Sequence, residues 1–250
     1  MFSLGIDSGS TTTKGILLDD QGIKKQLLIR TSASPRKSLY EIYHTFHSDL
    51  VTVTVTTGYG RSLLKEANRK ITEITCHAKG SRYFAPTCVG VIDVGGQDSK
   101  VIALDEDGNV SDFLMNDKCA AGTGRFMEVM MGILETELEE LDQFVMNASA
   151  IPISSMCTVF AESEIISLLA NDISKGNIAL GVVHAIAERT ANFYGRLNLS
   201  GPVFFSGGLS RSKIFCHILE EYLGQPLITD VMGQFAGAIG AALIGYESVE

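Results

Sequence analysis

The strongest constraint on the fold is a short segment that occurs twice in the first half of the chain. Residues 6–22 read IDSGSTTTKGILLDDQG and residues 92–108 read IDVGGQDSKVIALDEDG, and eight of the seventeen aligned positions are identical. In each copy an apolar strand ends in an aspartate, a glycine turn follows, and a second apolar strand leads to an acidic turn that ends in glycine. Two unrelated hairpins are the alternative, but eight matches without a gap favour a duplicated unit.

The turn in each copy has the composition of a phosphate-binding loop. Glycine lets the backbone approach a ligand closely, successive N–H groups form a concave anion site, and Ser or Thr hydroxyls add donors. The aspartates at the strand ends, Asp7 and Asp93, are suited to hold hydrated Mg²⁺ through water. Two such turns facing each other would clamp a nucleoside triphosphate from both sides, so the sequence predicts a nucleotide site.

The candidate residues of this site follow from the two turns. Lys14 can reach phosphate as a point charge, or it can lie on a solvated strand face. Either Gln97 or Asp98 is expected to orient the attacking water, and the sequence does not choose between them, since Asp98 can simply cap its turn. The other residues assigned to phosphate contacts are Ser8, Gly9, Ser10, Thr11, Thr12, Gly95 and Gly96.

The rest of the chain alternates between strand and helix. Residues 50–60, LVTVTVTTGYG, predict a strand that ends in a glycine turn, and residues 201–215 predict a strand, a Ser-Gly-Gly turn and a helix. The last helical segment is rich in Gly and Ala, so we expect it to pack closely on a sheet or against a flat ligand. Apolar spacing predicts helices over 162–174, 177–198, 211–223 and 233–246.

Further nucleotide contacts are assigned outside the hairpins. Gly207 and Gly208 are expected near the adenosine or the α-phosphate. Glu162 and Gln234 are weaker candidates for ribose and adenine, and Glu162 could equally be a charge at a helix N-terminus. The segment Gly122, Thr123 and Gly124 is assigned the same role as the Ser-Gly-Gly turn.

Composition and charge restrict the partners. The chain has 250 residues and a formal charge of −9 without a run of clustered Lys or Arg, which argues against nucleic acid or an anionic membrane as partners. No segment reaches the roughly 18 consecutive apolar residues of a membrane span, and the first residues, MFSLGIDSGS, do not form a secretory signal. Five cysteines fit a reduced cytoplasmic protein better than a disulfide framework. The five histidines lack metal spacing, so none is assigned a role.

Two cysteines stand in unusual contexts. Cys119 lies in NDKCAAGTGRF and Cys157 in SSMCTVFAESEII, each just before a predicted helix and without a CxxC partner. A helix N-terminus stabilises a thiolate, although an isolated cysteine is more often a small buried apolar residue. The remaining cysteines, 76, 88 and 216, fit ordinary strand or helix patterns and are expected to be structural.

Two charged features between these cysteines have simpler interpretations. Arg125 and Glu128 are one helical turn apart and are expected to pair on the surface. The acidic segment 134–145, LETELEELDQFV, repeats leucine at 134, 138 and 141 and predicts an amphipathic helix, with partner docking as the alternative.

These motifs resemble those of a known superfamily. DSGSTTTK, DVGGQDSK and the later SGG resemble the nucleotide-binding motifs of actin, hexokinase and heat-shock-protein-70. Within that superfamily, MNDKCAAGTGRF, SSMCTVFAESEII and QFAGAIGAAL are similar to the ATPase family of 2-hydroxyacyl-CoA dehydratase activators and benzoyl-CoA reductase subunits. The resemblance implies an α/β fold, a duplicated actin-like (ribonuclease H-like) two-lobe structure with a nucleotide cleft between the lobes. Lobe one would cover 1–88 with the C-terminal helix 233–250, and lobe two 89–232.

The family resemblance also implies a function for the two cysteines. Cys119 and Cys157 of each chain in a homodimer would share one [4Fe–4S] cluster, because a cluster takes four thiolates and one chain offers two. The cofactors would be ATP or ADP, Mg²⁺ and this cluster. Ferredoxin or flavodoxin would supply electrons, and an iron–sulfur dehydratase or reductase would receive them.

Two other functions stay open from the residues. A sugar or amino-sugar kinase of the same fold would lack the cluster, although no carboxylate between the turns is an evident base for a substrate hydroxyl. A nucleotide-sensing scaffold would hydrolyse ATP slowly and also lack iron. Iron content separates both from the electron donor.

Overall fold

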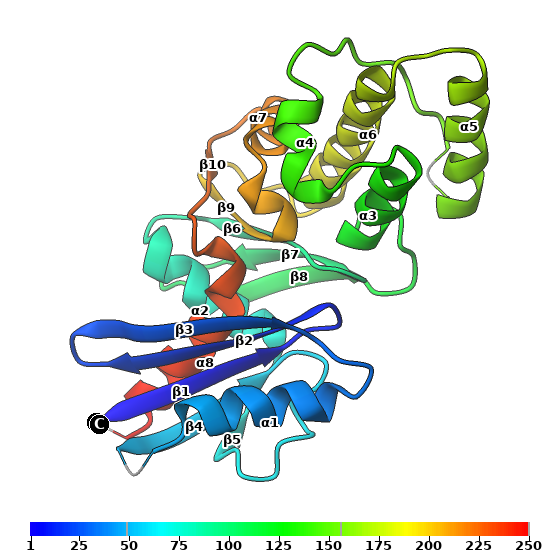
Figure 1. Cartoon of the computed structure of the whole chain (residues 1–250). Helices are drawn as coiled ribbons and strands as arrows, with labels where there is room; N and C mark the ends of the chain where they lie inside the picture. Colours follow the sequence, from blue (N-terminus) through cyan, green and yellow to red (C-terminus); the bar gives the residue numbers. More distant parts are fainter. Residues whose placement is uncertain (49, 156, 250) are drawn as a thin grey trace.

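The computed structural model describes residues 1–48, 50–155 and 157–249, which form two five-stranded mixed sheets with helices between and outside them (Figure 1). In the first sheet the order is β3-β2-β1-β4-β5, with β1 antiparallel to β2 and parallel to β4. Its strands are β1 (Phe2–Ser8), β2 (Thr12–Asp19), β3 (Gly22–Arg30), β4 (Val51–Thr57) and β5 (Arg69–Lys70).

The second sheet repeats the first strand for strand. Its order is β8-β7-β6-β9-β10, with β6 antiparallel to β7 and parallel to β9. The register is also repeated, because Asp7 pairs with Lys14 and Asp93 pairs with Lys100. The duplication predicted from one hairpin therefore extends to a whole sheet. Its strands are β6 (Gly90–Val94), β7 (Ser99–Leu104), β8 (Val110–Asn116), β9 (Val203–Gly207) and β10 (Leu227–Ile228).

The helices form layers around these sheets. Figure 1 shows α2 and α8 between the two sheets, α1 on the far face of the first sheet, and α3 to α7 beyond the second. The longer helices are α1 (Pro35–Phe46), α2 (Glu73–Phe84), α3 (Gly124–Ile133), α5 (Thr158–Ala170), α6 (Lys175–Gly195), α7 (Lys213–Leu223) and α8 (Ala236–Glu247). The short ones are η1 (Leu138–Glu140), α4 (Leu141–Phe144), η2 (Gly208–Arg211) and η3 (Gly233–Phe235).

The contact between α2 and α8 depends on glycine. A Cβ on Gly240 would lie 1.8 Å from the carbonyl oxygen of Cys76, and a Cβ on Gly80 would lie 1.9 Å from that of Ala236. The two backbones therefore touch directly, and α8 is buried on nearly all sides, which explains its Gly- and Ala-rich sequence. This pair of helices joins the two sheets, while the lobe boundary at residues 88 and 89 stays a prediction.

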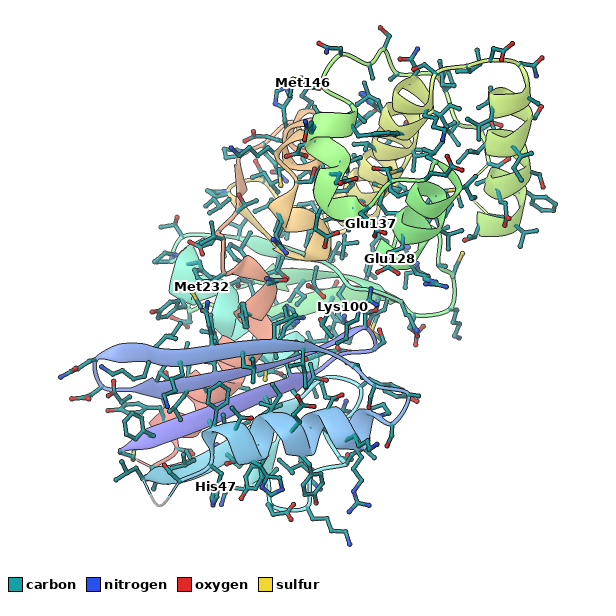
Figure 2. The ribbon with its side chains drawn as sticks, in the orientation of Figure 1. His47, Lys100, Glu128, Glu137, Met146 and Met232 are labelled. Carbon is teal, nitrogen blue, oxygen red and sulfur yellow. The ribbon has the colours of Figure 1, made fainter. Side chains whose placement is uncertain are left out.

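The acidic segment is not one amphipathic helix. The helix α3 ends at Ile133, because Glu135 adopts a left-handed backbone conformation (φ 59°), and only η1 and α4 follow. Figure 2 marks Glu137 and Met146 at the two ends of this short helical stretch. Asp142 accepts hydrogen bonds from the Ser212 hydroxyl (2.5 Å) and the backbone N–H of Lys213 (2.8 Å), so it caps α7.

The predicted helices exist with shifted ends. The segment predicted as 162–174 begins at Thr158, where Cys157 has extended backbone as its N-cap, and 177–198 begins at Lys175 after the cap Ser174. The surface pair Arg125–Glu128 is confirmed at 3.3 Å. In the described part of the chain, the helices are too short or too polar to cross a membrane.

Candidate functional site

The two glycine turns meet at the ends of β1 and β6. Each is closed by the same bond, from Gly9 N–H to the Thr12 carbonyl (3.1 Å) and from Gly95 N–H to the Asp98 carbonyl (2.9 Å). A Cβ on Gly96 would lie 1.8 Å from the Thr11 hydroxyl oxygen, so glycine is required for the turns to touch. The structure thus brings both predicted phosphate loops together.

Asp7 lies buried in a small cradle at the end of β1. Its carboxylate is 3.7 Å from the Lys14 ammonium, which is 14% exposed and so faces this site instead of a solvated strand face. The neighbouring Ser8 hydroxyl is buried without a hydrogen-bond partner among the described residues. A Cβ on Gly58 would lie 2.6 Å from the Asp7 carboxylate. A buried carboxylate with a lysine ammonium and bare glycine backbone around it fits a Mg²⁺–phosphate ligand, whereas the Ser8 hydroxyl lies toward Gly60, where a Cβ would come within 2.2 Å of it.

Asp93 lies in a denser charge cluster at the end of β6. The Lys100 ammonium lies 3.2 Å from Asp93, 2.7 Å from Asp98 and 3.5 Å from Glu73 on α2. Figure 2 shows Lys100 between the two sheets. Asp98 thus pairs with a lysine beyond its own turn.

These charges shift the pKa values of the cluster. Burial alone would raise the pKa of Asp93, but His77, Lys100 and the Ser206 hydroxyl together hold that pKa well below its usual range. Burial alone would lower the pKa of Lys100, but the carboxylates of Asp93, Asp98 and Glu73 raise it. Burial raises the pKa of Glu73 despite Lys100. Asp93 and Lys100 are therefore both charged at neutral pH.

Two residues of this site were not predicted from the sequence. The Ser206 hydroxyl donates to Asp93 Oδ1 at 2.5 Å, and His77 Nδ1 lies 3.2 Å from the same hydroxyl. His77 comes from α2 and Ser206 from β9, so they are far from the hairpins in sequence. Only the position of Ser206 directly before the predicted Gly-Gly turn hinted at it.

The place of a third glycine turn in the site was also missed, although the sequence predicts a glycine turn at the end of the strand in residues 50–60. Thr57 pairs with Asp7 across β4 and β1, as Ser206 pairs with Asp93 across β9 and β6. Each is followed by a glycine with positive φ, Gly58 at 82° and Gly207 at 97°, which L residues rarely adopt. The turn after β4 is therefore the first sheet's counterpart of the Ser-Gly-Gly turn, and the shared strand–Ser/Thr–Gly pattern was the signal for it.

The other predicted nucleotide contacts lie at different distances from these turns. Gln97 is exposed at the tip of the second turn, and Gln234 is half-buried in η3, which packs against β9. Gly208 is exposed directly after β9. Glu162 is exposed on α5, which packs against α3 and α6, so the structure does not bring it to the glycine turns. The roles of all these residues stay predictions.

Cys119 lies exposed in the loop between β8 and α3. The Asn116 side chain donates to its carbonyl oxygen at 2.8 Å and fixes this loop. The start of α3 is bound to the second glycine turn, because Gly124 N–H donates to the Gly95 carbonyl and Arg125 N–H to the Gly96 carbonyl, both at 2.8 Å. The cysteine loop and the predicted phosphate loop are thus joined through one helix end.

Cys157 lies exposed at the N-cap of α5. One carboxylate of the same helix, Glu164, accepts hydrogen bonds from the backbone N–H groups of Ser154 (2.9 Å) and Ser155 (2.8 Å). Partial burial alone would raise the pKa of Glu164, but these donors hold it below its usual range. A polar side chain therefore positions each cysteine segment.

The other three cysteines differ from this pair. Cys76 and Cys88 are buried and Cys216 is half-buried, and burial raises the pKa of Cys76 and of Cys216 to about 12. None of the described residues form a group of three or more His, Cys, Asp or Glu able to hold a metal ion. The donor set of two exposed thiols fits half of a cluster shared with a second copy.

Comparison with known proteins gives a consistent assignment. Residues 4–245 match the model of the BadF/BadG/BcrA/BcrD ATPase family. The uncharacterized protein YjiL of Escherichia coli is 51% identical over 98% of this chain and 96% of its own length. The activator of lactoyl-CoA dehydratase from Anaerotignum propionicum is 40% identical over 100% of this chain and 99% of its own.

Solved structures agree with this result. The activator of 2-hydroxyisocaproyl-CoA dehydratase from Clostridium difficile with bound ADPNP superposes with a TM-score of 0.92 at 36% identity, covering 99% of this chain and 95% of that one. A ROK-family glucokinase from Streptomyces griseus, 12% identical with a TM-score of 0.63 over 99% and 100% of the two chains, shows the fold alone. The two-lobe actin-like fold is thereby confirmed, and the chain belongs to the BadF/BadG/BcrA/BcrD ATPase family.

Proposed function

We propose that this chain is an ATP-hydrolysing iron–sulfur activator that passes low-potential single electrons to a 2-hydroxyacyl-CoA dehydratase-like partner. Ferredoxin or flavodoxin would be its electron donor, and the active form would be a homodimer. Relatives named as dehydratase activators at 36–40% identity over nearly the whole chain support the partner class.

The pair of exposed cysteines is the observation that carries this proposal. Cys119 and Cys157 precede α3 and α5, two helices that pack against each other. The backbone of each cysteine segment is held by a polar side chain, Asn116 before α3 and Glu164 on α5, and a kinase of this fold does not require two exposed thiols there. Two chains would hold one [4Fe–4S] cluster with four thiolates, and such a cluster supplies one-electron transfer when bound.

The nucleotide half of the proposal rests on the two turns. Asp7 and Asp93 would hold Mg²⁺ through water, and the two glycine turns would hold the phosphates. The relative solved with bound ADPNP supports nucleotide binding by this fold. Either Gln97 or Asp98 would orient the attacking water, and the ion pair of Asp98 with Lys100 favours the exposed Gln97.

A physical connection between the two halves is present in the chain. The bonds from Gly124 and Arg125 to the second turn mean that a shift of this turn must move the start of α3. Movement of α3 would displace the Cys119 loop, which precedes it, and α5, which packs on it. Nucleotide state could thereby change the exposure of the thiolates and of a partner-docking surface.

Anaerobic purification with iron and sulfide assays and an absorption spectrum tests the proposal. We expect a dimer with about two irons per chain and an iron–sulfur colour. Cys119→Ala and Cys157→Ala should lose both iron and colour, because each removes two of the four thiolates of the dimer. Cys216→Ala is the matched control and should keep both, since its thiol is half-buried on α7.

One result would contradict the electron-transfer function. A colourless, iron-free protein after anaerobic cluster reconstitution would leave the thiols without a redox role. Phosphorylation assays with sugars and amino sugars would then be the next experiment, because the fold alone is compatible with a small-molecule kinase.

A further inference from the structure

His77 occupies a central position that the proposed function does not use. It is 5% exposed on α2, the helix between the two sheets. Its Nδ1 lies 3.2 Å from the Ser206 hydroxyl and 3.7 Å from Asp93 Oδ1. The ring therefore reaches into the second sheet on one side.

The hydrogen bonds define which ring nitrogen carries a proton. Ser206 has one hydroxyl hydrogen, and the 2.5 Å contact assigns it to the Asp93 carboxylate. The Ser206 oxygen is then an acceptor, so Nδ1 of His77 must donate to it. Asp93 of the second sheet is thus connected to α2 by two successive hydrogen bonds, from His77 to Ser206 and from Ser206 to Asp93.

The other side of the ring faces the first sheet. A Cβ on Gly237 would lie 2.9 Å from both His77 Nε2 and Asp7 Oδ2. These two polar atoms therefore flank one point of α8, and any side chain there would collide with both. Gly237 keeps the space between the imidazole and Asp7 free.

We infer that His77 is a positioning residue that holds the two duplicated aspartates, Asp7 and Asp93, in the relative arrangement that a Mg²⁺–nucleotide between them requires. Each aspartate belongs to its own sheet, and the ten strands that the structure describes form two separate sheets. A buried ring that contacts one carboxylate through Ser206 and faces the other across Gly237 sets their separation. The inference rests on the nucleotide part of the proposed function and is independent of the cluster.

Three substitutions of His77 distinguish the role of Nδ1 from the role of Nε2. His77→Asn places an amide donor near Nδ1 and keeps the bond to Ser206, His77→Gln extends an amide toward Nε2, and His77→Leu removes both. The matched control is His217→Asn, since His217 is an exposed histidine on α7 whose Nε2 lies 3.4 Å from a Glu221 carboxylate oxygen. ATPase kcat, KM for ATP and the half-saturating Mg²⁺ concentration are measured for each.

We expect His77→Leu to lower kcat about 100-fold, the usual effect of misplacing catalytic groups, with KM for ATP changed less than about threefold. The half-saturating Mg²⁺ concentration should rise, while affinity for ADP without Mg²⁺ stays unchanged. His77→Asn should recover part of kcat. Adding Ser206→Ala to His77→Leu should cause little further loss, because both residues act through Asp93.

Several outcomes would overturn the inference. One is a folded His77→Leu protein with wild-type kcat and Mg²⁺ requirement. Another is a loss seen only as higher KM with an unchanged Mg²⁺ requirement, which indicates a structural role. If His77→Leu does not fold, a wild-type kcat in both His77→Asn and His77→Gln would also overturn the inference. If the wild type hydrolyses no ATP, an unchanged Mg²⁺ dependence of ADPNP affinity in these variants overturns the inference too.

Iron analysis of the same proteins keeps the two proposals apart. His77 variants should contain as much iron as the wild type, because the ring lies at the aspartates, whereas the thiols lie exposed in the loop between β8 and α3 and at the start of α5. An iron-free protein that shows the His77 effects would contradict electron transfer and support the positioning role.

Discussion

Replacing Lys100 by methionine measures how far the second turn depends on one buried cation. Lys100 is 2% exposed and its ammonium contacts three carboxylates, at 2.7, 3.2 and 3.5 Å. Methionine preserves most of the aliphatic volume, so the change removes charge without opening a large cavity. The result is a set of acidic groups with no cation among them.

The expected loss follows from how well each acid can be rehydrated. Removing one partner of a buried ion pair costs about 3–5 kcal/mol. Asp93 keeps His77 and Ser206, and the side chains of Asp98 and Glu73 are 25% and 23% exposed, so water can partly replace the ammonium. We therefore expect the lower end, about 3 kcal/mol of unfolding free energy at pH 7.

The duplication provides the matched control. Lys14→Met removes the equivalent lysine of the first hairpin, which is 14% exposed and whose ion pair among the described residues is with Asp7 at 3.7 Å. The loss of stability in Lys14→Met should be smaller than that in Lys100→Met, because one longer contact is removed in place of three. Urea unfolding followed by far-ultraviolet circular dichroism at pH 5 and pH 8 measures both variants.

The pH dependence has a definite sign. Burial already raises the pKa of Glu73, and loss of Lys100 should raise it further. A raised acid pKa means that the folded state binds its proton more tightly, so stability falls as pH rises. The Lys100→Met loss should thus be larger at pH 8 than at pH 5. Equal losses in the two lysine variants, or a Lys100→Met loss that is independent of pH, would refute this reasoning.

Three further predictions concern other parts of the chain. Gly240→Ala should lower the free energy of unfolding by about 2 kcal/mol, because its Cβ would lie 1.8 Å from a backbone carbonyl oxygen of α2. Gly132→Ala should instead stabilise the protein by up to about 1 kcal/mol, because a Cβ on Gly132 would have nothing within 4 Å and alanine favours the helix. Thermal unfolding of both variants measures the difference. The Glu164 carboxyl should titrate below its ordinary 4.5 in NMR, and its support of the Cys157 loop should be lost as pH falls through that midpoint. Ellman's reagent should modify Cys119 and Cys157 rapidly in the native apo-protein and the other three cysteines only after unfolding.

The fold was predictable to the extent that it is encoded locally. Two copies of a short hairpin pattern, with apolar alternation and glycine turns, predicted the duplicated unit and placed Asp7 and Asp93 correctly at strand ends. The prediction of one amphipathic helix over the acidic segment 134–145 was wrong. The spacing of its leucines carries no information about the backbone of Glu135, whose left-handed conformation ends α3. Local pattern predicts elements better than it predicts their ends.

The site was predictable where it lies on the hairpins and not elsewhere. His77 and Ser206 are 129 positions apart, and only the pairing of β9 with β6 and the position of α2 between the sheets bring them to Asp93. A buried histidine on a helix has no local signature that separates it from a core residue. Contacts of this kind follow from tertiary structure alone.

The two hairpins have diverged in a way that separates their lysines. In the second copy Lys100 is surrounded by three carboxylates and is not available to a ligand. Among the described residues, the ion pair of Lys14 in the first copy is the 3.7 Å contact with Asp7, which is longer than any of the three Lys100 contacts. We therefore expect Lys14, and not Lys100, to be the lysine that meets phosphate. Isothermal titration with Mg²⁺–ADPNP should show a weaker affinity for Lys14→Met, by about tenfold for the loss of one charge-assisted contact of about 1.4 kcal/mol. An unchanged affinity would instead place phosphate on the backbone of the turns alone.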